Sequence, residues 1–229
     1  MRRRTQRFVD RSSAGRELAL TLRQHVRGPV RVLGLPRGGV PVAYEIAQIL
    51  QAPLDVLVVR KIGLPNQPEL AIGALAGGEV VREPGAENWV SSRDFARLAR
   101  EQAAELARRE NTYRAGQAPL DLKQQRVILV DDGLATGCSM LAAMRAARKA
   151  GASAVMVAAP VAADEAAALV RAEADAFFAL EIPANLSSIG EWYQDFEQLT
   201  DEEVCNLLAL SREALCISRT VAGVPAQLT

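Results

Sequence analysis

The chain has 229 residues, and its 27 lysines and arginines balance its 27 aspartates and glutamates, so its formal net charge is zero. A chain without excess positive charge is a poor candidate for a general nucleic-acid binder, whose affinity comes mainly from neutralising phosphates. With 49% hydrophobic residues the chain can form a sizeable core, and its length predicts a single domain over residues 1–229.

Cysteine spacing and the apolar runs predict the compartment. Cys138, Cys205 and Cys216 show no C-x-x-C spacing, so neither a disulfide framework nor a zinc site is expected. The first ten residues are basic but no apolar stretch follows them, unlike in a secretory signal. The longest apolar run, residues 154–163, is too short to span a bilayer. We therefore expect a soluble cytoplasmic protein with no membrane or nucleic-acid partner.

The first half of the chain alternates short apolar runs with other segments. Val30–Leu35 predicts a strand, and a helical stretch, Val40–Gln51, follows a glycine-rich turn. Leu54–Val59 predicts a second strand. The segment Arg60–Arg82 carries glycine and proline at short intervals, which is typical of a long loop or hairpin rather than a helix.

The second half continues this alternation. Ser91 with Asp94 predicts the start of a helix, and Thr200 with Glu203 predicts the start of the last one. The segments between them are expected to be strand Arg126–Val130, helix Ser139–Ala150, strand Ala154–Ala159, helix Asp164–Ala174 and strand Phe177–Ile182. Nearly continuous hydrophobic strands that alternate with helices indicate a parallel sheet covered on both faces. The predicted fold is therefore α/β, with three layers and a mainly parallel sheet of about five strands.

The third predicted strand leads into the turn that carries the clearest chemistry, within residues 127–140. Thr136, Gly137 and Ser139 lie where this turn opens a helix. Backbone amides at a helix N-terminus, with a hydroxyl on either side of a glycine, suit a phosphate dianion. Asp131 and Asp132 leave the strand directly before the turn, and ionised carboxylates suit a vicinal diol or a hydrated divalent cation.

A phosphate and a diol a few ångströms apart describe a ribose 5-phosphate. A glycine–threonine turn after a strand can also be an ordinary βα loop, with acidic residues that cap the helix. The complete pattern in its strand–loop–helix context favours the ligand site.

This segment resembles the type I phosphoribosyltransferases, whose motif is an apolar strand, two acidic residues and an A/D-T-G-x-T/S loop. The matching residues are Asp131, Asp132, Ala135, Thr136, Gly137 and Ser139, with serine at position 139 where threonine is more usual. The resemblance implies that the two aspartates bind the ribose hydroxyls of 5-phosphoribosyl 1-diphosphate. The loop that would bind its 5-phosphate comprises Gly133, Leu134, Ala135, Thr136, Gly137, Cys138 and Ser139. It also implies Mg²⁺, bound by Asp131 and Asp132 indirectly, through ribose hydroxyls or water.

The turn after the first strand, residues 34–41, is similar to the pyrophosphate loop of the family. Arg37 and the amides around Gly38 and Gly39 would face the leaving group. Proline-arginine-glycine-glycine before a helix gives a tight turn, exposed amides and a bidentate cation. The alternative is an ordinary turn with a solvated arginine.

The end of the second strand, Val59-Arg60-Lys61, is similar to the arginine–lysine pair that precedes the family's mobile loop. Lys61 is the candidate catalytic contact to the pyrophosphate, because a compact ammonium suits a point contact with phosphate. A solvated strand end is the alternative. Glu69, within the loop, is a further candidate whose role the sequence leaves open.

The resemblance covers about Val30–Leu180 and implies an enzyme: a homodimer that transfers the phosphoribosyl group to a nitrogenous base in nucleotide salvage or related metabolism. The alternative is a regulatory or sensor protein that binds the diphosphate sugar, or a nucleotide, without catalysis. A receiver-type acidic pocket is disfavoured, because its acidic pair would follow the first strand and not the third.

The family selects its base with a variable hood, expected here in the N-terminal stretch and residues 182–199, beside a core of about 28–181 and a C-terminal helix over 200–218. Ala135 replaces the aspartate of the hypoxanthine and guanine enzymes, which argues against these bases. Trp192 and Tyr193 would stack on a base or, more simply, pack the hood onto the core. The single histidine, His25, lies on a predicted helix and is interpreted as structural.

Overall fold

The computed structural model describes residues 7–64, 66–115, 117–118 and 120–221, without the side chains of residues 68–70 and 218–221. The first six residues of the N-terminal stretch and the side chain of Glu69 therefore lie outside the described part of the chain.

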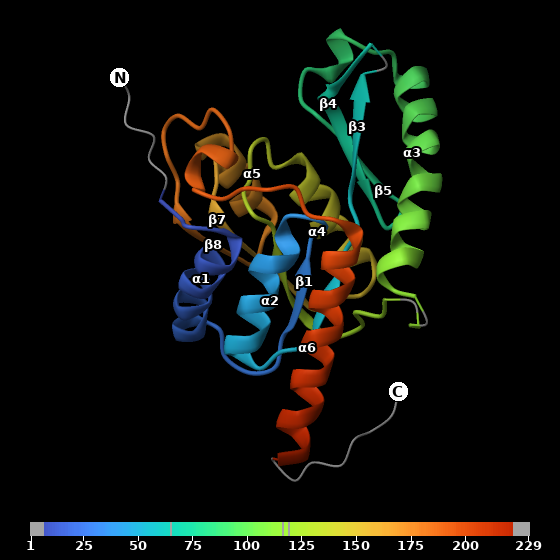
Figure 1. The fold of residues 1–229 in the computed structure, drawn as a ribbon. Coiled ribbons are helices and arrows are strands. Elements are labelled where there is room, and N and C mark those ends of the chain that lie inside the picture. Colours follow the sequence, from blue (N-terminus) through green and yellow to red (C-terminus); the bar gives the residue numbers. More distant parts are fainter. Residues whose placement is uncertain (1–6, 65, 116, 119, 222–229) are drawn as a thin grey trace.

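A five-stranded parallel sheet in the order β2-β1-β6-β7-β8 forms the centre of the molecule (Figure 1). Its strands are β1 (Arg31–Gly34), β2 (Leu54–Val56), β6 (Arg126–Val130), β7 (Ala154–Val161) and β8 (Ala176–Glu181). The chain moves to one side of β1 to form β2 and to the other side to form β6. The strand order therefore reverses between β1 and β6, and the predicted α/β fold is confirmed.

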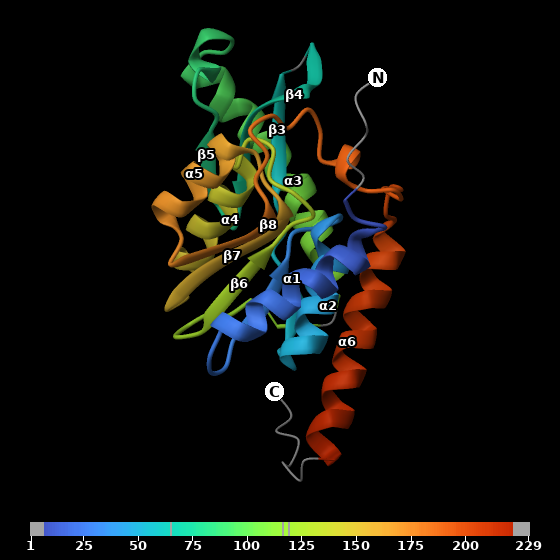
Figure 2. The same ribbon diagram turned by 90° about the vertical axis from the view of Figure 1, so that its left-hand side faces the viewer.

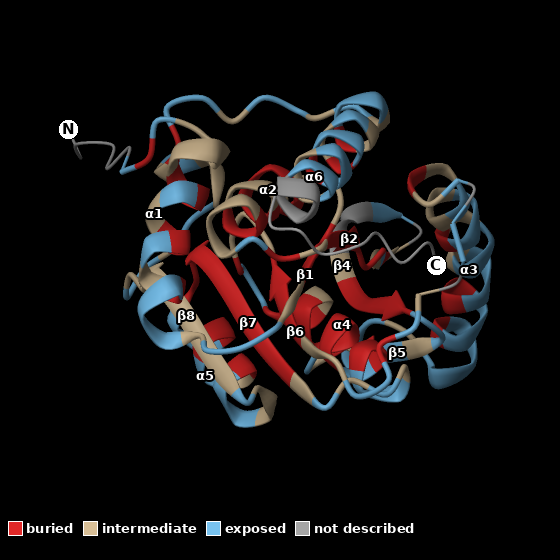
Figure 3. Ribbon diagram, turned by 90° about the horizontal axis from the view of Figure 1, so that it is seen from below, coloured by how far each residue is buried: buried red, intermediate tan, exposed pale blue. Residues whose placement is uncertain are grey.

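Helices cover both faces of this sheet, as Figure 2 shows. One face carries α1 (Arg11–His25), α2 (Gly39–Leu50) and α6 (Asp201–Val221), and the other carries α4 (Cys138–Lys149) and α5 (Asp164–Glu173). Strand β6 alternates between the two cores: Ile128 and Val130 pack on the first side, whereas Val127 and Leu129 pack on the second. The central strands are accordingly buried along most of their length (Figure 3). The predicted three layers are confirmed.

A second sheet stands beside the first. Strands β3 (Arg60–Leu64), β4 (Gln67–Ala76) and β5 (Glu79–Arg82) form an antiparallel sheet against α3 (Ser92–Tyr113). The sequence predicts a long loop or a hairpin over Arg60–Arg82. The loop is wrong for most of this segment, and the hairpin alternative agrees better with the antiparallel sheet. Ile62 and Ile72 are fully buried here, and Gly73 allows the Phe95 ring to approach where a Cβ would lie 2.8 Å from it. The predicted second strand is also shorter than expected, because β2 ends at Val56 and the chain then crosses to the second sheet.

The helix starts follow the predicted caps. Ser91 accepts a hydrogen bond from the amide of Asp94 at 3.1 Å. Thr200 and Glu203 form a complete capping box, because each side chain accepts from the backbone amide of the other. Two short 3-10 turns, η1 (Ala86–Asn88) and η2 (Gly190–Trp192), complete the elements. Among the described helices, none combines the length and the apolar character required to cross a bilayer.

Residues 7–10 pair with the segment 182–199, and the two together are called the hood here. The backbone of Phe8 donates to the carbonyl of Trp192 and accepts from the amide of Gln194, both at 2.9 Å. The Tyr193 ring lies between the rings of Phe8 and Phe196, with centroid distances of 5.4 and 5.0 Å. These contacts attach the chain segment before α1 to the segment that follows β8.

Candidate functional site

The loops that follow β1 and β6 lie on either side of the position where the strand order reverses. In open parallel sheets this is where ligands bind, because the two loops diverge and leave a crevice at the carboxyl ends of the strands. A cavity of about 750 Å³ occupies this place. Its walls come from the loop after β6, the start of β3, strand β4, helix α3 and the hood.

Most of the predicted site residues line this cavity. They are Lys61, Asp131, Asp132, Gly133, Leu134, Ala135, Thr136, Gly137, Cys138 and Ser139. Arg37, Gly38 and Gly39 are not among the lining residues; of their loop, only Leu35 and Pro36 reach the cavity. The peptide bond between Pro36 and Arg37 is cis.

Gly38 and Gly39 instead allow the loop after β1 to lie directly against the acidic pair, Asp131 and Asp132. A Cβ at Gly38 would lie 2.0 Å from Oδ2 of Asp132, and a Cβ at Gly39 would lie 2.4 Å from the carbonyl oxygen of Val130. Any side chain at either position would displace the strand end or its carboxylates. The observed role of these glycines is therefore close packing. The amide of Gly39 donates to the carbonyl oxygen of Leu35 at 3.0 Å, and presentation of amides to a leaving group stays a prediction.

The acidic pair is electrostatically unfavourable by itself. Burial and, next, the charge of Asp132 raise the pKa of Asp131, while Lys61 and Arg11 oppose this shift. Burial also raises the pKa of Asp132, against the attraction of Arg11 and Lys61. Two half-buried carboxylates side by side therefore attract the cations that surround them, and would be stabilised by the hydroxyl donors of a ligand.

The start of α4 forms the opposite end of the crevice. Gly137 has φ +81°, a conformation that favours glycine, and it immediately precedes the helix. The first amides of a helix have no acceptor within it. The amide of Cys138 donates to Oγ1 of Thr136 at 3.4 Å, so the amides of Ser139 and Met140 provide the donors next to the hydroxyls of Thr136 and Ser139. This arrangement can bind an anion such as a phosphate group.

Cys138 contributes its backbone to this loop, whereas its thiol packs into the core. The residue is 5% exposed, and Sγ lies 3.9 Å from the carbonyl oxygen of Val81. Burial raises the pKa of the thiol to about 12. The side chain is therefore a packing element and a poor nucleophile.

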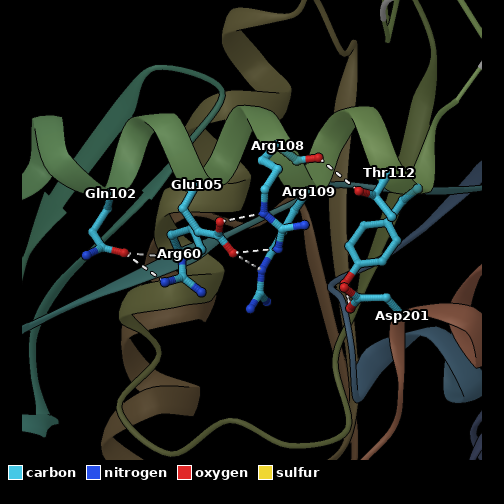
Figure 4. A network of polar contacts seen from close by, with 8 residues as sticks. Arg60, Gln102, Glu105, Arg108, Arg109, Thr112 and Asp201 are labelled. Carbon is cyan, nitrogen blue, oxygen red and sulfur yellow. Dashed lines mark hydrogen bonds and ion pairs between the residues drawn. The ribbon is translucent and has the colours of Figure 1, made fainter.

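A basic wall faces the acidic pair across the cavity, formed by Arg60, Lys61 and Arg109. Figure 4 shows how α3 positions two of these cations: Arg60 donates to Gln102 at 2.8 Å, and Arg109 pairs with Glu105 at 3.0 Å. Burial and, next, the neighbouring charge of Arg109 lower the pKa of Arg60. Clustered cations of this kind can attract an anion.

Arg109 was missed by the sequence reasoning, and so was Arg11. Glu105 and Arg109 have the i, i+4 spacing of an ordinary solvated helix pair, so nothing in the sequence separates Arg109 from its exposed neighbours. Arg11 is the first residue of α1 and reaches Asp132 from 121 positions away. No local pattern could have indicated that contact.

The aromatic residues of the hood form one cluster, of which Phe196 also lines the cavity. Tyr193 is 2% exposed, and its hydroxyl donates to the backbone carbonyl of Asp132 at 2.6 Å. Trp192 is half-buried against the same cluster. The packing role is thus the one observed for Tyr193. His25 lies with Nδ1 2.9 Å from the carbonyl oxygen of Thr21, away from the cavity, as a structural residue would.

Similar proteins were found in sequence and in structure. One relative in each of two Mycobacterium tuberculosis strains, H37Rv and CDC 1551, is 44% identical over 208 residues, and each carries the provisional name phosphoribosyl transferase. The match covers 88% of this chain but 46% of each relative, so the chain spans about half the length of these two proteins. The crystal structure of TT1426 from Thermus thermophilus is 43% identical, with a TM-score of 0.73 over 88% of this chain and 97% of that one.

The family assignment is consistent with the crevice and its loops. The sequence model of the phosphoribosyl transferase domain matches residues 10–196, which include the central sheet, the acidic pair and the hood. Together with relatives that are more than two-fifths identical over most of the chain, this places the protein in a family. The chain belongs to the phosphoribosyl transferase domain family.

Proposed function

We propose that this protein transfers the 5-phosphoribosyl group from 5-phosphoribosyl 1-diphosphate to a nitrogenous base and releases pyrophosphate. One observation carries the proposal: the acidic pair and the N-terminus of α4 lie at the two ends of one short loop, in the crevice where the strand order reverses. Diol acceptors beside a phosphate cradle match the ribose 5-phosphate part of this substrate.

Each part of the cavity receives one part of the substrate. Thr136, Ser139 and the first amides of α4 bind the 5-phosphate, and Asp131 and Asp132 accept hydrogen bonds from the ribose hydroxyls. The diphosphate then extends toward the basic wall, where Lys61 contacts it, with the loop of Arg37 beside it. The base enters from the apolar side of the cavity, which Leu134, Ile189 and Phe196 line.

The reaction is a displacement at C1 of the ribose. The bond from C1 to the diphosphate oxygen breaks and its electron pair leaves with pyrophosphate, while a ring nitrogen of the base forms the new bond to C1 and loses its proton to the departing pyrophosphate or to water. Positive charge that develops on the ribose is stabilised by the acidic pair, and negative charge on the leaving group by Lys61 and the arginines. Positioning and electrostatics supply the catalysis, without a covalent enzyme intermediate.

Magnesium fits this site only as a partner of the substrate. No group of three or more acidic, histidine or cysteine side chains that could hold a metal occurs among the described residues, and the acidic pair supplies just two carboxylates. Asp131 and Asp132 would therefore bind Mg²⁺ through ribose hydroxyls or water. Bound there, the ion would offset the charge of the diphosphate.

The proposal is tested by incubation of the protein with Mg²⁺, 5-phosphoribosyl 1-diphosphate and a mixture of purine and pyrimidine bases. New nucleotides detected by mass, formed together with pyrophosphate, are the expected result. Asp132→Asn should abolish turnover, whereas Asp164→Asn, an exposed aspartate at the start of α5, should leave it unchanged. Full activity of Asp132→Asn would contradict the site assignment.

The regulatory alternative has its own outcome in this experiment. Tight binding of 5-phosphoribosyl 1-diphosphate without release of pyrophosphate from any of the bases would favour a sensor over an enzyme.

A further inference from the structure

Arg11 binds the acidic pair from the hood side. Its Nε donates to Oδ2 of Asp132 at 2.7 Å, and the side chains of Arg11 and Asp132 are only 12% and 14% exposed. A charge-assisted hydrogen bond shielded to this degree is stronger than a surface ion pair. The contact therefore fixes the position of one carboxylate oxygen.

The hood in turn holds Arg11. The guanidinium lies over the ring of Phe196, 3.8 Å from its centroid, and Nη1 donates to the carbonyl oxygen of Glu197 at 2.9 Å. A planar guanidinium bound at two nitrogens and stacked on a ring has little freedom to turn. The hydroxyl of Tyr193 attaches the same hood to the carbonyl of Asp132. Side chain and backbone of Asp132 are thus both connected to the hood.

Among the residues that the structure describes, hydrogen bonds to the acidic pair use one oxygen of each side chain. Oδ1 of Asp131 accepts from the amide of Asp132 at 2.9 Å, and Oδ2 of Asp132 accepts from Arg11. The remaining two oxygens, Oδ2 of Asp131 and Oδ1 of Asp132, match the two hydroxyl donors of a vicinal diol. A carboxylate that was free to rotate would present either oxygen, and the pair of acceptors would not be defined.

We propose that Arg11 is a positioning residue for the ribose: it holds Oδ2 of Asp132, so that the other oxygen of this carboxylate and Asp131 receive the ribose hydroxyls. This role rests on the proposed function of the cavity. Because Arg11 is bound to Phe196 and Glu197, it also ties the ribose site to the hood. The bond persists when substrate binds, and Arg11 is not displaced by it.

The test compares one ligand that contacts Asp132 with one that does not. Ribose 5-phosphate contacts the acidic pair and the start of α4, whereas inorganic phosphate binds at the start of α4 or at the basic wall and makes no contact that requires Asp132. We expect Arg11→Ala to lower the affinity for ribose 5-phosphate roughly 10- to 100-fold, the range typical of lost supporting contacts. The affinity for inorganic phosphate should not change. Isothermal titration calorimetry measures both affinities. A general loss of structure would lower both affinities equally.

Two further variants control for folding and charge. Arg11→Lys keeps a cation beside Asp132 but loses the fork and the stacking on Phe196, so it should recover only part of the affinity for ribose 5-phosphate that Arg11→Ala loses. Arg16→Ala, on the same helix, removes an exposed ion pair with Glu45 and should change the affinity for neither ligand. Thermal unfolding of each variant verifies that it is folded.

The outcomes separate this role from the proposed function. If the unaltered protein binds neither ribose 5-phosphate nor 5-phosphoribosyl 1-diphosphate, the proposed function fails, and the role of Arg11 fails with it. If the unaltered protein binds ribose 5-phosphate and Arg11→Ala binds it equally well, only the positioning role fails. Tighter binding by Arg11→Ala would also overturn the role, because Arg11 would then be a competitor of the ribose.

Discussion

Gly38 and Asp132 lie in contact across the position where the strand order reverses, so close that a Cβ on Gly38 would lie 2.0 Å from Oδ2 of Asp132. That same oxygen accepts the hydrogen bond of Arg11. The carboxylate is therefore fixed between a glycine of the loop after β1 and an arginine of α1. Three segments far apart in the chain meet at one oxygen atom.

Gly38→Ala should weaken the ribose site more than it destabilises the fold. The added methyl group forces the Asp132 carboxylate away from Arg11, and overpacking of this kind costs about 1–3 kcal/mol of unfolding free energy. We expect the affinity for ribose 5-phosphate to fall at least about ten-fold, as misplaced contacts typically produce. Gly78→Ala, at φ +79° in the turn between β4 and β5, is a control that strains the backbone without touching the cavity. Equal binding by Gly38→Ala and the unaltered protein would contradict the contact.

Tyr193→Phe should destabilise the protein by about 1 kcal/mol, because the carbonyl of Asp132 loses a hydrogen-bond donor in a buried place. Urea unfolding measures the change. Tyr44→Phe on α2 is the matched control, since the hydroxyl of Tyr44 makes no hydrogen bond to the described residues. A loss equal to that of the control would mean that the Tyr193 hydroxyl contributes nothing.

Arg109 and Arg108 offer a matched pair, because both bind Glu105 but only Arg109 lines the cavity. We expect Arg109→Ala to weaken binding of pyrophosphate by about ten-fold, the value of one charge-assisted contact of about 1.4 kcal/mol. Arg108→Ala should have little effect, since its side chain is 57% exposed. Titration calorimetry at two salt concentrations checks both variants. If both variants lost the same affinity for pyrophosphate, the loss would come from a change in α3 and not from a contact inside the cavity.

Cys138 should resist alkylation in the folded protein. Burial raises the pKa of its thiol to about 12, so at pH 8 nearly all of it is protonated, and the thiolate is the form that reacts. Cys216 is exposed and should react with iodoacetamide much faster. Peptide mass spectrometry follows the two sites, and denaturation should remove the difference. Labelling of both at one rate in the folded protein would show that Cys138 is accessible.

The parts of the fold that the sequence predicted best are contiguous in the chain. Strand β6 has the predicted bounds, Arg126–Val130, because an uninterrupted apolar run between polar flanks leaves little choice of structure. The Asp131–Ser139 segment was predictable for the same reason: strand, turn and helix start are neighbours in sequence. The segment from Arg60 to Arg82 was harder. Glycine and proline obscure its pattern, and its strands are stabilised by contacts with Phe95 of α3.

The sequence by itself thus determined the fold class, the acidic pair and the loop at the start of α4, because hydrophobic periodicity and turn chemistry act over a few residues. Only the tertiary structure decided which cations surround the acidic pair. Arg11 arrives from the first turn of α1 and Arg109 from near the C-terminal end of α3, and neither differs locally from the exposed arginines beside it. The physical reason is that a long, flexible side chain acquires its partner only after the elements have packed, and packing depends on contacts between residues far apart in the chain.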